Sequence, residues 1–382
     1  MSKDLINFIR DLYATKESIP LHEPYFDEAE KESVIKAIDS TFVSSVGPMV
    51  NQFEQKITEY TGSRYAISVV NGTAALHTAL LLSGVTQDDE VITQSLTFVA
   101  TCNAIHYCNA KPILLDVDLK TLGLSAEALR VFLDSHCELR DDGLCWNKLS
   151  NRIIRACLPV HTFGLSLEIS LIKEICDQFN IVLIEDAAES LGTRFKGEHT
   201  GTIGKYGILS FNGNKIITTG AGGMILTDDE EKAIEAKHIT TTAKLEHQWF
   251  FGHNQIALNY RLPNLNAALG ITQMDKLPEF IRKKRIIASA YQEWGRENNF
   301  RFMKELPTTK SNYWLNTIIT ENIDQRDQIL EETNAESVMT RPAWTPMHKL
   351  NFHHGLQTDS LKNTEWLFER IVNVPSSMII NA

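Results

Sequence analysis

The chain has 382 residues, of which 43% are hydrophobic and 22% are charged, and this composition is typical of a globular protein with a sizeable core. Thirty-seven Lys and Arg residues stand against 48 Asp and Glu residues, so the formal net charge is -11. This charge excludes a protein that wraps nucleic acid through a basic surface, but a few local groups can still hold a small anion.

The N-terminal segment and the cysteines indicate a cytoplasmic protein. MSKDLINFIRDLYATKE (1–17) carries acidic residues early and lacks the apolar core of a signal peptide. No uncharged apolar run reaches the roughly 18 residues of a membrane span. The six cysteines form no CxxC pair, so we expect free thiols and no metal site. We therefore expect neither a membrane nor a nucleic-acid partner.

Apolar runs alternate with helical patterns through the first two thirds of the chain. Strands are predicted in five apolar runs, at 66–70, 90–94, 111–118, 153–160 and 181–187. Helices are predicted between them, at 73–85, 98–108, 125–136 and 167–180. Two further strands are expected at 207–211 and 222–228. This order predicts an α/β fold with a mostly parallel, mixed sheet that helices cover on both faces.

The last third of the chain has a different pattern. A helical block at 229–243 precedes the segment 263–294, which predicts a long helix or a broken pair. We place a large domain at 1–255, and a smaller C-terminal α/β domain at 256–382 that includes the long helical connection. The polar stretch 137–152 is expected to be a surface excursion.

Ligands of open α/β sheets bind beyond the carboxyl ends of the strands, so the loops there are the first candidates for a site. NGTAAL (71–76) leads from a strand straight into a helix, and free N–H groups at a helix start suit a phosphate. Taken alone, this segment is better explained as a plain helix cap.

Two further strand ends carry groups that could act in chemistry. IVLIEDAAES (181–190) places Glu185 and Asp186 after an apolar run, where a buried carboxylate needs a partner such as a cationic ring nitrogen. A helix cap or a structural ion pair is an equally good explanation. His161 in PVHTFG (159–164) would be taken for a satisfied core residue if it stood alone.

A single lysine lies in SFNGNKIITTGAGGM (210–224), between two predicted strands. Burial lowers the pKa of a lysine and leaves more neutral amine to attack a carbonyl. Lysine Schiff-base chemistry needs a cofactor aldehyde, a phosphate cradle and an acid that faces the pyridine nitrogen. Groups of all three kinds follow successive strands, so Lys215 is a candidate nucleophile.

The ordered series of motifs resembles the DegT/DnrJ/EryC-type sugar aminotransferases, which are pyridoxal-phosphate (PLP) enzymes of fold type I, the aspartate-aminotransferase fold. The resemblance runs from about residue 19 to residue 377. It rests on NGTAAL, LTFVAT (96–101), PVHTFG, IEDAAES (184–190), SFNGNKIITTGAGG (210–223) and LNYRLPNLNAALG (258–270).

The resemblance implies a role for each matching residue. Lys215 would form the Schiff base with the cofactor and carry protons, Asp186 would face the pyridinium nitrogen, and Phe98 would stack on the ring. The implied phosphate contacts are Gly72, Thr73, Ala74 and Ser210.

Other implied residues surround this group. Asn259 and Arg261 would reach the active site of the second subunit of a homodimer. Glu189 takes a place where many relatives carry glutamine or histidine near the ring oxygen of the cofactor. His161 would lie near the cofactor or the sugar.

The lysine also bears on the reaction. Relatives that act as sugar dehydratases replace it with histidine, so Lys215 favours amino transfer, with glutamate as donor and 2-oxoglutarate as its product. A PLP-dependent dehydratase and a non-catalytic protein of the same fold are the alternatives.

The substrate is implied by three segments: IPLHEPYF (19–26), DSTFVSSVGPMVNQFE (39–54) and TRPAWTPMHKL (340–350). They resemble the enzymes that aminate C4 of a UDP-linked 4-keto-6-deoxy-N-acetylglucosamine, in pathways to bacillosamine and legionaminic acid of bacterial surface glycans. The implied sugar-nucleotide pocket takes residues from 39–47 and 341–348, among them Arg341, Trp344 and His348. Another keto nucleotide sugar (3-keto, or dTDP- or GDP-linked) is the alternative. Without the resemblance, TRPAWTPMHKL would be taken for a proline-punctuated loop.

Overall fold

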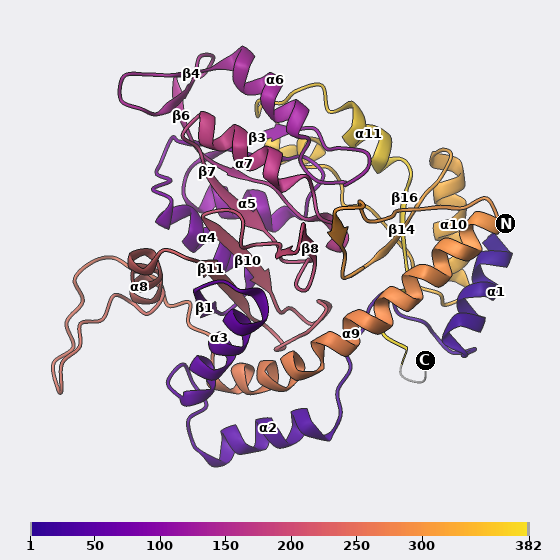
Figure 1. Ribbon diagram of the computed structural model, residues 1–382, viewed down its shortest axis with the longest axis horizontal. Coiled ribbons are helices and arrows are strands. Elements are labelled where there is room, and N and C mark those ends of the chain that lie inside the picture. The colour runs from indigo at the N-terminus through magenta and orange to yellow at the C-terminus, as the bar shows by residue number, and fades with distance from the viewer. Residues whose placement is uncertain (1, 380–382) are drawn as a thin grey trace.

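The structure, a computed structural model, describes residues 2–379, and its largest element is a mixed sheet (Figure 1). The strand order is β1-β11-β10-β7-β6-β2-β3. Only β11 runs antiparallel to its neighbours along this path, so the carboxyl ends of the other strands lie at one edge. The strands are β1 (Tyr65–Val69), β2 (Glu90–Gln94), β3 (Lys111–Leu115), β6 (Arg152–Leu158), β7 (Val182–Asp186), β10 (Tyr206–Ser210) and β11 (Gly223–Thr227). The predicted α/β class is confirmed.

Helices join these strands, and side chains fix where several of them begin. Asn71 Oδ1 accepts the N–H of Ala74, and Ser125 Oγ accepts the N–H of Ala128, as N-caps do. The helices are α4 (Gly72–Leu82), α5 (Val99–Tyr107), α6 (Ala126–His136), α7 (Ile169–Gln178) and α8 (Glu230–Ile239). Every helix predicted in this part of the chain forms, within a few residues at each end.

One predicted loop contains strands, and one predicted helical segment, for which a long helix and a broken pair were the alternatives, forms a single helix. The stretch 137–152 contains a hairpin of β4 (Cys137–Leu139) and β5 (Cys145–Asn147), and β5 pairs with β6, so this excursion extends the sheet. The segment after residue 263 forms one helix, α9 (Asn264–Glu297), although Pro278 lies inside it.

A second, smaller sheet forms in the C-terminal part, in the order β12-β14-β16-β15. Its elements, with their helices, are β12 (Arg301–Phe302), β14 (Asn316–Ile319), α10 (Ile323–Ala335), β15 (Arg341–Pro342), α11 (Lys362–Phe368) and β16 (Ile371–Val374). The N-terminal helix α1 (Ser2–Tyr13) joins this unit, because Leu5 and Ile9 pack in one cluster with Ile318 and Val374. The domain division at 255 stays a prediction, but the small unit takes part of its core from the N-terminus.

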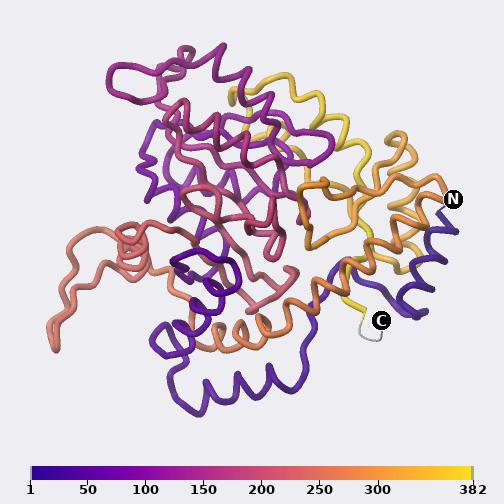
Figure 2. The backbone as a smooth tube through the Cα atoms, in the orientation of Figure 1, coloured from indigo at the N-terminus to yellow at the C-terminus, as the bar shows by residue number. Residues whose placement is uncertain are grey.

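The two ends of the described chain lie on the same side of the molecule in Figure 2, where the Tyr13 hydroxyl donates to Ser377 O at 3.1 Å. Beside the large sheet, α2 (Glu28–Asp39) and α3 (Pro48–Thr61) pack on α9. A third, short sheet is made of β8 (Arg194–Phe195), β9 (Glu198–His199) and β13 (Thr309–Lys310).

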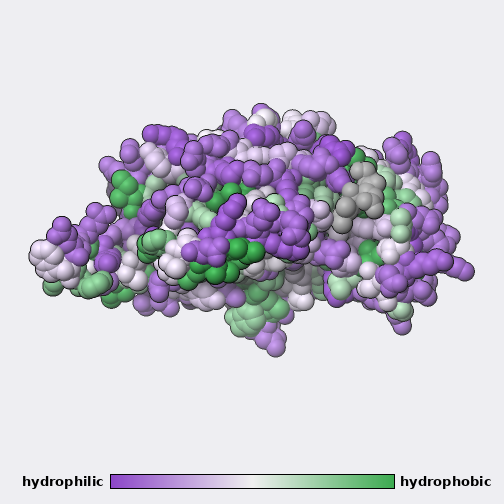
Figure 3. Space-filling model, turned by 90° about the horizontal axis from the view of Figure 1, so that it is seen from below, coloured by the Kyte–Doolittle hydropathy of each residue, from purple (hydrophilic) through white to green (hydrophobic). Residues whose placement is uncertain are grey.

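An arm, residues 244–256, projects from the body beyond α8 (Figures 1 and 2). Figure 3 looks at the face that carries α2 and shows hydrophobic side chains gathered near its middle. None of the helices in residues 2–379 combines the length and the apolar character that crossing a membrane requires.

Candidate active site

A cavity of about 300 Å³ lies where the carboxyl ends of the parallel strands meet. Residues that follow β1, β2, β7 and β10 line it, together with two tryptophans from the C-terminal part. The predicted residues that line it are Gly72, Thr73, Phe98, Asp186, Glu189, Ser210, Lys215 and Trp344. The structure thus brings together predicted residues that are far apart in the sequence, from Gly72 to Trp344.

The start of α4 forms one wall of the cavity. Its first intrahelical bond runs from Ala75 N to Asn71 O, so the N–H groups of Gly72 and Thr73 come before the helical ladder. A Cβ on Gly72 would come within 2.9 Å of Ser210 Cβ, which shows how closely β10 approaches this helix start. The Ala74 N–H donates to Asn71 Oδ1 at 2.8 Å, and its contact with a phosphate stays a prediction.

Asp186, the last residue of β7, is buried with 4% of its surface exposed. Its Oδ2 accepts the Thr101 hydroxyl at 3.0 Å, and its Oδ1 accepts the Ala188 N–H at 3.2 Å. Burial raises the pKa of this carboxyl above its usual range, although these hydrogen bonds and Lys215 act in the opposite direction. A cationic partner at this carboxylate would therefore be strongly favoured.

Lys215 lies in the turn between β10 and β11, where its backbone N–H donates to Asn212 O at 2.9 Å. Its Nζ is 3.2 Å from Glu189 Oε1 and 4.2 Å from the centroid of the Trp314 ring. Only 14% of the lysine side chain is exposed. The amine is thus held between a carboxylate and an aromatic face at the floor of the cavity.

Aromatic side chains form the opposite wall. The rings of Phe98 and Trp344 lie 6.3 Å apart between centroids, and Trp344 packs on Phe163 at 4.8 Å. Phe98 is 52% exposed, so one side of its ring is open to a planar group.

Three predicted substrate residues lie elsewhere. His161 is fully buried, and its Nε2 pairs with Glu185 Oε2 at 2.9 Å. His348 contacts Ser95 Oγ and Glu365 Oε1. Arg341 lies exposed in the edge strand β15 of the small sheet and donates to Asn334 Oδ1. Among the described residues, the lining of the cavity does not include these three, so their predicted contact with substrate has no support within one chain.

The residues predicted to serve a second subunit are also absent from the lining of this chain's own cavity, as are residues 39–47. Asn259 is exposed and pairs with Thr241, and Arg261 pairs with Val69. Both follow the arm in the chain.

Trp314 and Thr101 also belong to the site, although neither is a predicted site residue. Trp314 comes from SNYWLN (311–316), far from any strand end of the large sheet, and no pattern pointed to it. Thr101 lies three residues after Phe98 in LTFVAT, one helical turn away, and that spacing could have indicated it.

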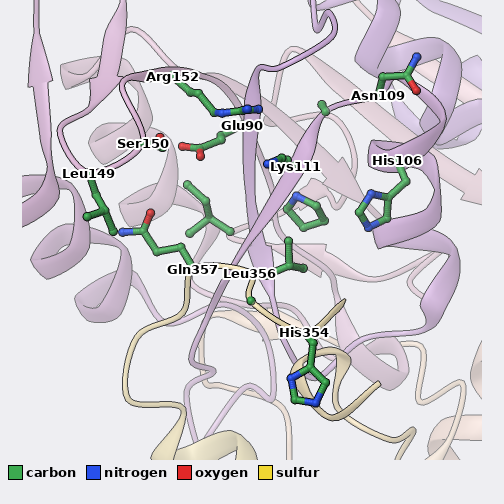
Figure 4. Close-up of a pocket in the computed structure, with 14 residues that line it drawn as sticks. Glu90, His106, Asn109, Lys111, Leu149, Ser150, Arg152, His354, Leu356 and Gln357 are labelled. Atoms are coloured by element: carbon green, nitrogen blue, oxygen red, sulfur yellow. The ribbon is translucent and has the colours of Figure 1, made fainter. Parts of the chain in front are cut away.

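A second hollow, of about 570 Å³, lies at the opposite edge of the sheet (Figure 4). The first residues of β2, β3 and β6 (Glu90, Lys111 and Arg152) line it, together with residues 354–357. None of the predicted site residues lines this hollow. No group of His, Cys, Asp and Glu in residues 2–379 is arranged to hold a metal ion.

Comparison with known proteins identifies the family. The model of the DegT/DnrJ/EryC1/StrS aminotransferase family matches residues 24–381. EpsN of Bacillus subtilis (strain 168), a proposed pyridoxal phosphate-dependent aminotransferase, is 36% identical over 363 residues, which are 94% of this chain and 90% of the relative. GDP-perosamine synthase of Escherichia coli O157:H7 is 34% identical over 332 residues, 87% of this chain and 86% of the relative.

A solved structure agrees with this result. The crystal structure of the aminotransferase TlmJ from Streptoalloteichus hindustanus superposes with a TM-score of 0.84 at 26% identity, over 94% of each chain.

The cavity fits pyridoxal phosphate by its own chemistry. Free N–H groups at a helix start and the Thr73 and Ser210 hydroxyls suit a phosphate, and the missing Cβ of Gly72 keeps that cradle open. A buried carboxylate suits a protonated ring nitrogen, and a lysine amine suits an aldehyde.

Proposed function

Because the chain belongs to the DegT/DnrJ/EryC1/StrS aminotransferase family and is a PLP-dependent sugar aminotransferase, we propose that it transfers the amino group of glutamate to C4 of a nucleotide-linked 4-keto-6-deoxyhexose. The observation that carries the proposal is the meeting of Lys215, Asp186 and the start of α4 at one cavity. Bound there, PLP would supply the electron-withdrawing ring that stabilises a carbanion at the amino-acid carbon.

The residues of the chain divide the remaining work. The Gly72 and Thr73 N–H groups and the Ser210 hydroxyl would bind the phosphate, and Asp186 would hold the proton on the ring nitrogen. Lys215 Nζ would carry the proton that amino transfer moves between donor and cofactor, and would return it when the sugar accepts the amine. The aromatic wall of Phe98 and Trp344 orients the planar ring and excludes water.

One site serves both substrates in turn. Glutamate enters first and leaves as 2-oxoglutarate, and the keto sugar then takes the amine. A lysine at position 215 supports amino transfer over the dehydratase alternative, because family members that act as sugar dehydratases carry a histidine in its place.

The nucleotide is the least constrained part of the proposal. The motifs of the sequence favour a UDP-linked 2-acetamido-2,6-dideoxy-4-ketohexose, for bacillosamine- or legionaminic-type glycans. The names of several relatives, GDP-perosamine synthases that are 32–34% identical to this chain, support a GDP-linked keto sugar as the second candidate.

A homodimer is part of the proposal, with Asn259 and Arg261 of each chain serving the cavity of the other. The cavity supports this, because Lys215 is the only Lys or Arg among its described lining residues, whereas PLP and a nucleotide bring several phosphate charges.

Two measurements test the function. Adding glutamate to the PLP-loaded protein should replace the long-wavelength cofactor absorbance by that of the pyridoxamine form, with 2-oxoglutarate released. UDP-, GDP- and dTDP-linked 4-keto sugars should then be compared by mass spectrometry for gain of the amine. If no amino acid changes the cofactor spectrum, the proposed amino transfer is refuted. If the sugar gains the amine at C3 alone, the proposed position C4 is refuted.

A further inference from the structure

We propose that Glu189 is a catalytic acid–base residue that takes a proton from the Lys215 ammonium and so converts the lysine into a nucleophile. The inference rests on the proposed role of Lys215 as the cofactor lysine. It goes beyond the role of Lys215 because it gives Glu189 a proton-transfer step in addition to a contact with the cofactor.

The contact between the two groups is direct and shielded. Glu189 Oε1 lies 3.2 Å from Lys215 Nζ, and only 5% of the Glu189 side chain is exposed. Trp314 covers the amine, and its indole N–H donates to Asn214 O at 2.7 Å, which holds the ring in place. Bulk water therefore has little access to this proton.

The surrounding backbone holds the Glu189 carboxylate in position. Its Oε2 accepts the N–H of Phe163 at 2.8 Å, and Phe163 adopts a left-handed φ of 56° that a phenylalanine rarely takes. Asn312 Nδ2 donates to Glu189 O at 2.9 Å, from a segment of the C-terminal part. The Phe163 N–H thus fixes one carboxylate oxygen, Asn312 fixes the backbone of Glu189, and the other carboxylate oxygen faces the lysine.

Glu189 is a better acceptor than the other buried carboxylate. Both oxygens of Asp186 already accept hydrogen bonds, from Thr101 and Ala188, whereas Glu189 Oε1 faces the amine. Burial and the charge of Asp186 raise the pKa of Glu189, while Lys215 and the Phe163 N–H lower it, and the net direction is upward. His22 and His161 are the other titratable groups whose charges act on this set.

The proton step balances. Glu189 Oε1 takes one proton from the Nζ ammonium, and the neutral amine then condenses with the cofactor aldehyde. Nitrogen gives its two remaining hydrogens to the departing oxygen, which leaves as one water, and a C=N bond replaces C=O. The proton held on Glu189 then returns to the nitrogen, so the carboxylate ends as it began.

The rate of PLP uptake by the cofactor-free full chain tests the proposal, and it separates the two roles that Glu189 could have. A carboxylate that only pairs with the ammonium keeps the lysine charged, so Glu189→Gln would then speed uptake. A carboxylate that accepts the proton is needed for the step, so Glu189→Gln should slow uptake at neutral pH by about 10²-fold. Stopped-flow absorbance would measure this rate for the wild type and for each variant under the same conditions.

Chemical rescue adds a readout that a structural role would not move. Glu189→Ala leaves room for a small carboxylate, and formate should restore part of the uptake rate in this variant but not in Glu189→Gln. Glu365→Gln removes a carboxylate that pairs with His348 and Lys349 away from the cavity, and it should leave uptake unchanged. Faster or unchanged uptake in Glu189→Gln, or slow uptake in Glu189→Ala that formate does not restore, would overturn the proposal.

The same samples separate this inference from the proposed function. Borohydride reduction of the PLP-loaded wild type, followed by peptide mapping, should find the cofactor on Lys215. If the cofactor is found on another residue, the proposed function of Lys215 fails, whatever the Glu189 variants show.

Discussion

Three carboxylates within five residues, Glu185, Asp186 and Glu189, have different environments. Glu185 accepts the N–H groups of Gly201, Ile203 and Gly204 as well as His161, and these donors lower its pKa in spite of complete burial. Burial prevails at Asp186 and Glu189, whose pKa values are raised. Successive side chains of a strand point to opposite faces, so Glu185 turns away from the cavity that Asp186 lines. The sequence predicted a functional carboxylate here, but it could not show which residue takes His161 as its partner.

Replacement of Asp186 by Asn should separate catalysis from stability. Asn can accept the Ala188 N–H through its amide oxygen and donate its NH2 to the Thr101 hydroxyl, which reverses that bond. It cannot hold a ring proton, so we expect amino transfer to fall by about 10²-fold or more. The pKa of Asp186 is higher in the folded than in the unfolded protein, so the folded protein binds the proton more tightly. The free energy of unfolding therefore falls as the pH rises from the unfolded pKa through the folded pKa.

The cofactor-free Asp186→Asn variant should therefore be more stable than the wild type at neutral pH, and the difference should vanish below about pH 4. Urea unfolding at several pH values measures it. If Asp186→Asn is less stable than the wild type at neutral pH, the buried charge of Asp186 does not lower the stability of the folded protein, and the prediction is wrong.

His161 should behave as a structural residue. His161→Ala leaves the buried Glu185 carboxylate without its side-chain partner, so we expect a loss of about 3 kcal/mol in the free energy of unfolding. The Glu185 pKa is lowered in the folded state, so its stabilising effect is present above its unfolded pKa and is lost on acidification through the folded one. Denaturant unfolding and the KM for the keto sugar should be measured together. A raised KM with unchanged stability would instead support the predicted substrate contact.

At the scale of elements, the sequence predicted what local patterns control. The strands of the large sheet are continuous apolar runs, and the helices between them carry recognisable caps such as Ser125, so their order could be predicted. The hairpin at 137–147 could not, because charged residues separate its few apolar ones and its pairing depends on the edge of β6. Trp314 reaches the cavity through tertiary packing alone, and no local pattern encodes such an approach.

The start of α4 gives a prediction at this scale. A Cβ at Gly72 would clash with Ser210, so Gly72→Ala should push the helix start away from β10 and weaken PLP binding by about tenfold or more, since one lost phosphate hydrogen bond costs about 1.5–3 kcal/mol. Gly213→Ala is the matched control, because its Cβ would meet no atom within 4 Å. PLP titration followed by fluorescence measures both variants. Equal affinities in the two variants would show that the phosphate does not sit at this helix start.

At the scale of the whole molecule, the arm and the neighbouring surface leave apolar side chains uncovered. Trp249, Phe250, Phe251 and Ile256 are each more than 60% exposed. On α2 and the loop after it, Ile35, Ile38 and Phe42 are more than half exposed. Exposed apolar surface of this extent is typical of a protein interface, and the arm leads directly to Asn259 and Arg261.

A subunit-mixing experiment tests whether these exposed surfaces join two chains that share their active sites. Lys215→Ala and Arg261→Ala should each be inactive as homodimers, because every cavity then lacks either its lysine or the arginine of the second chain. In a hybrid dimer, one cavity carries both changes and the other carries neither. Equal amounts of the two variants, unfolded together and refolded, form hybrids in half of the dimers, so about one quarter of wild-type activity should return. If Arg261 serves the cavity of its own chain, every site of the hybrid keeps one defect and no activity returns.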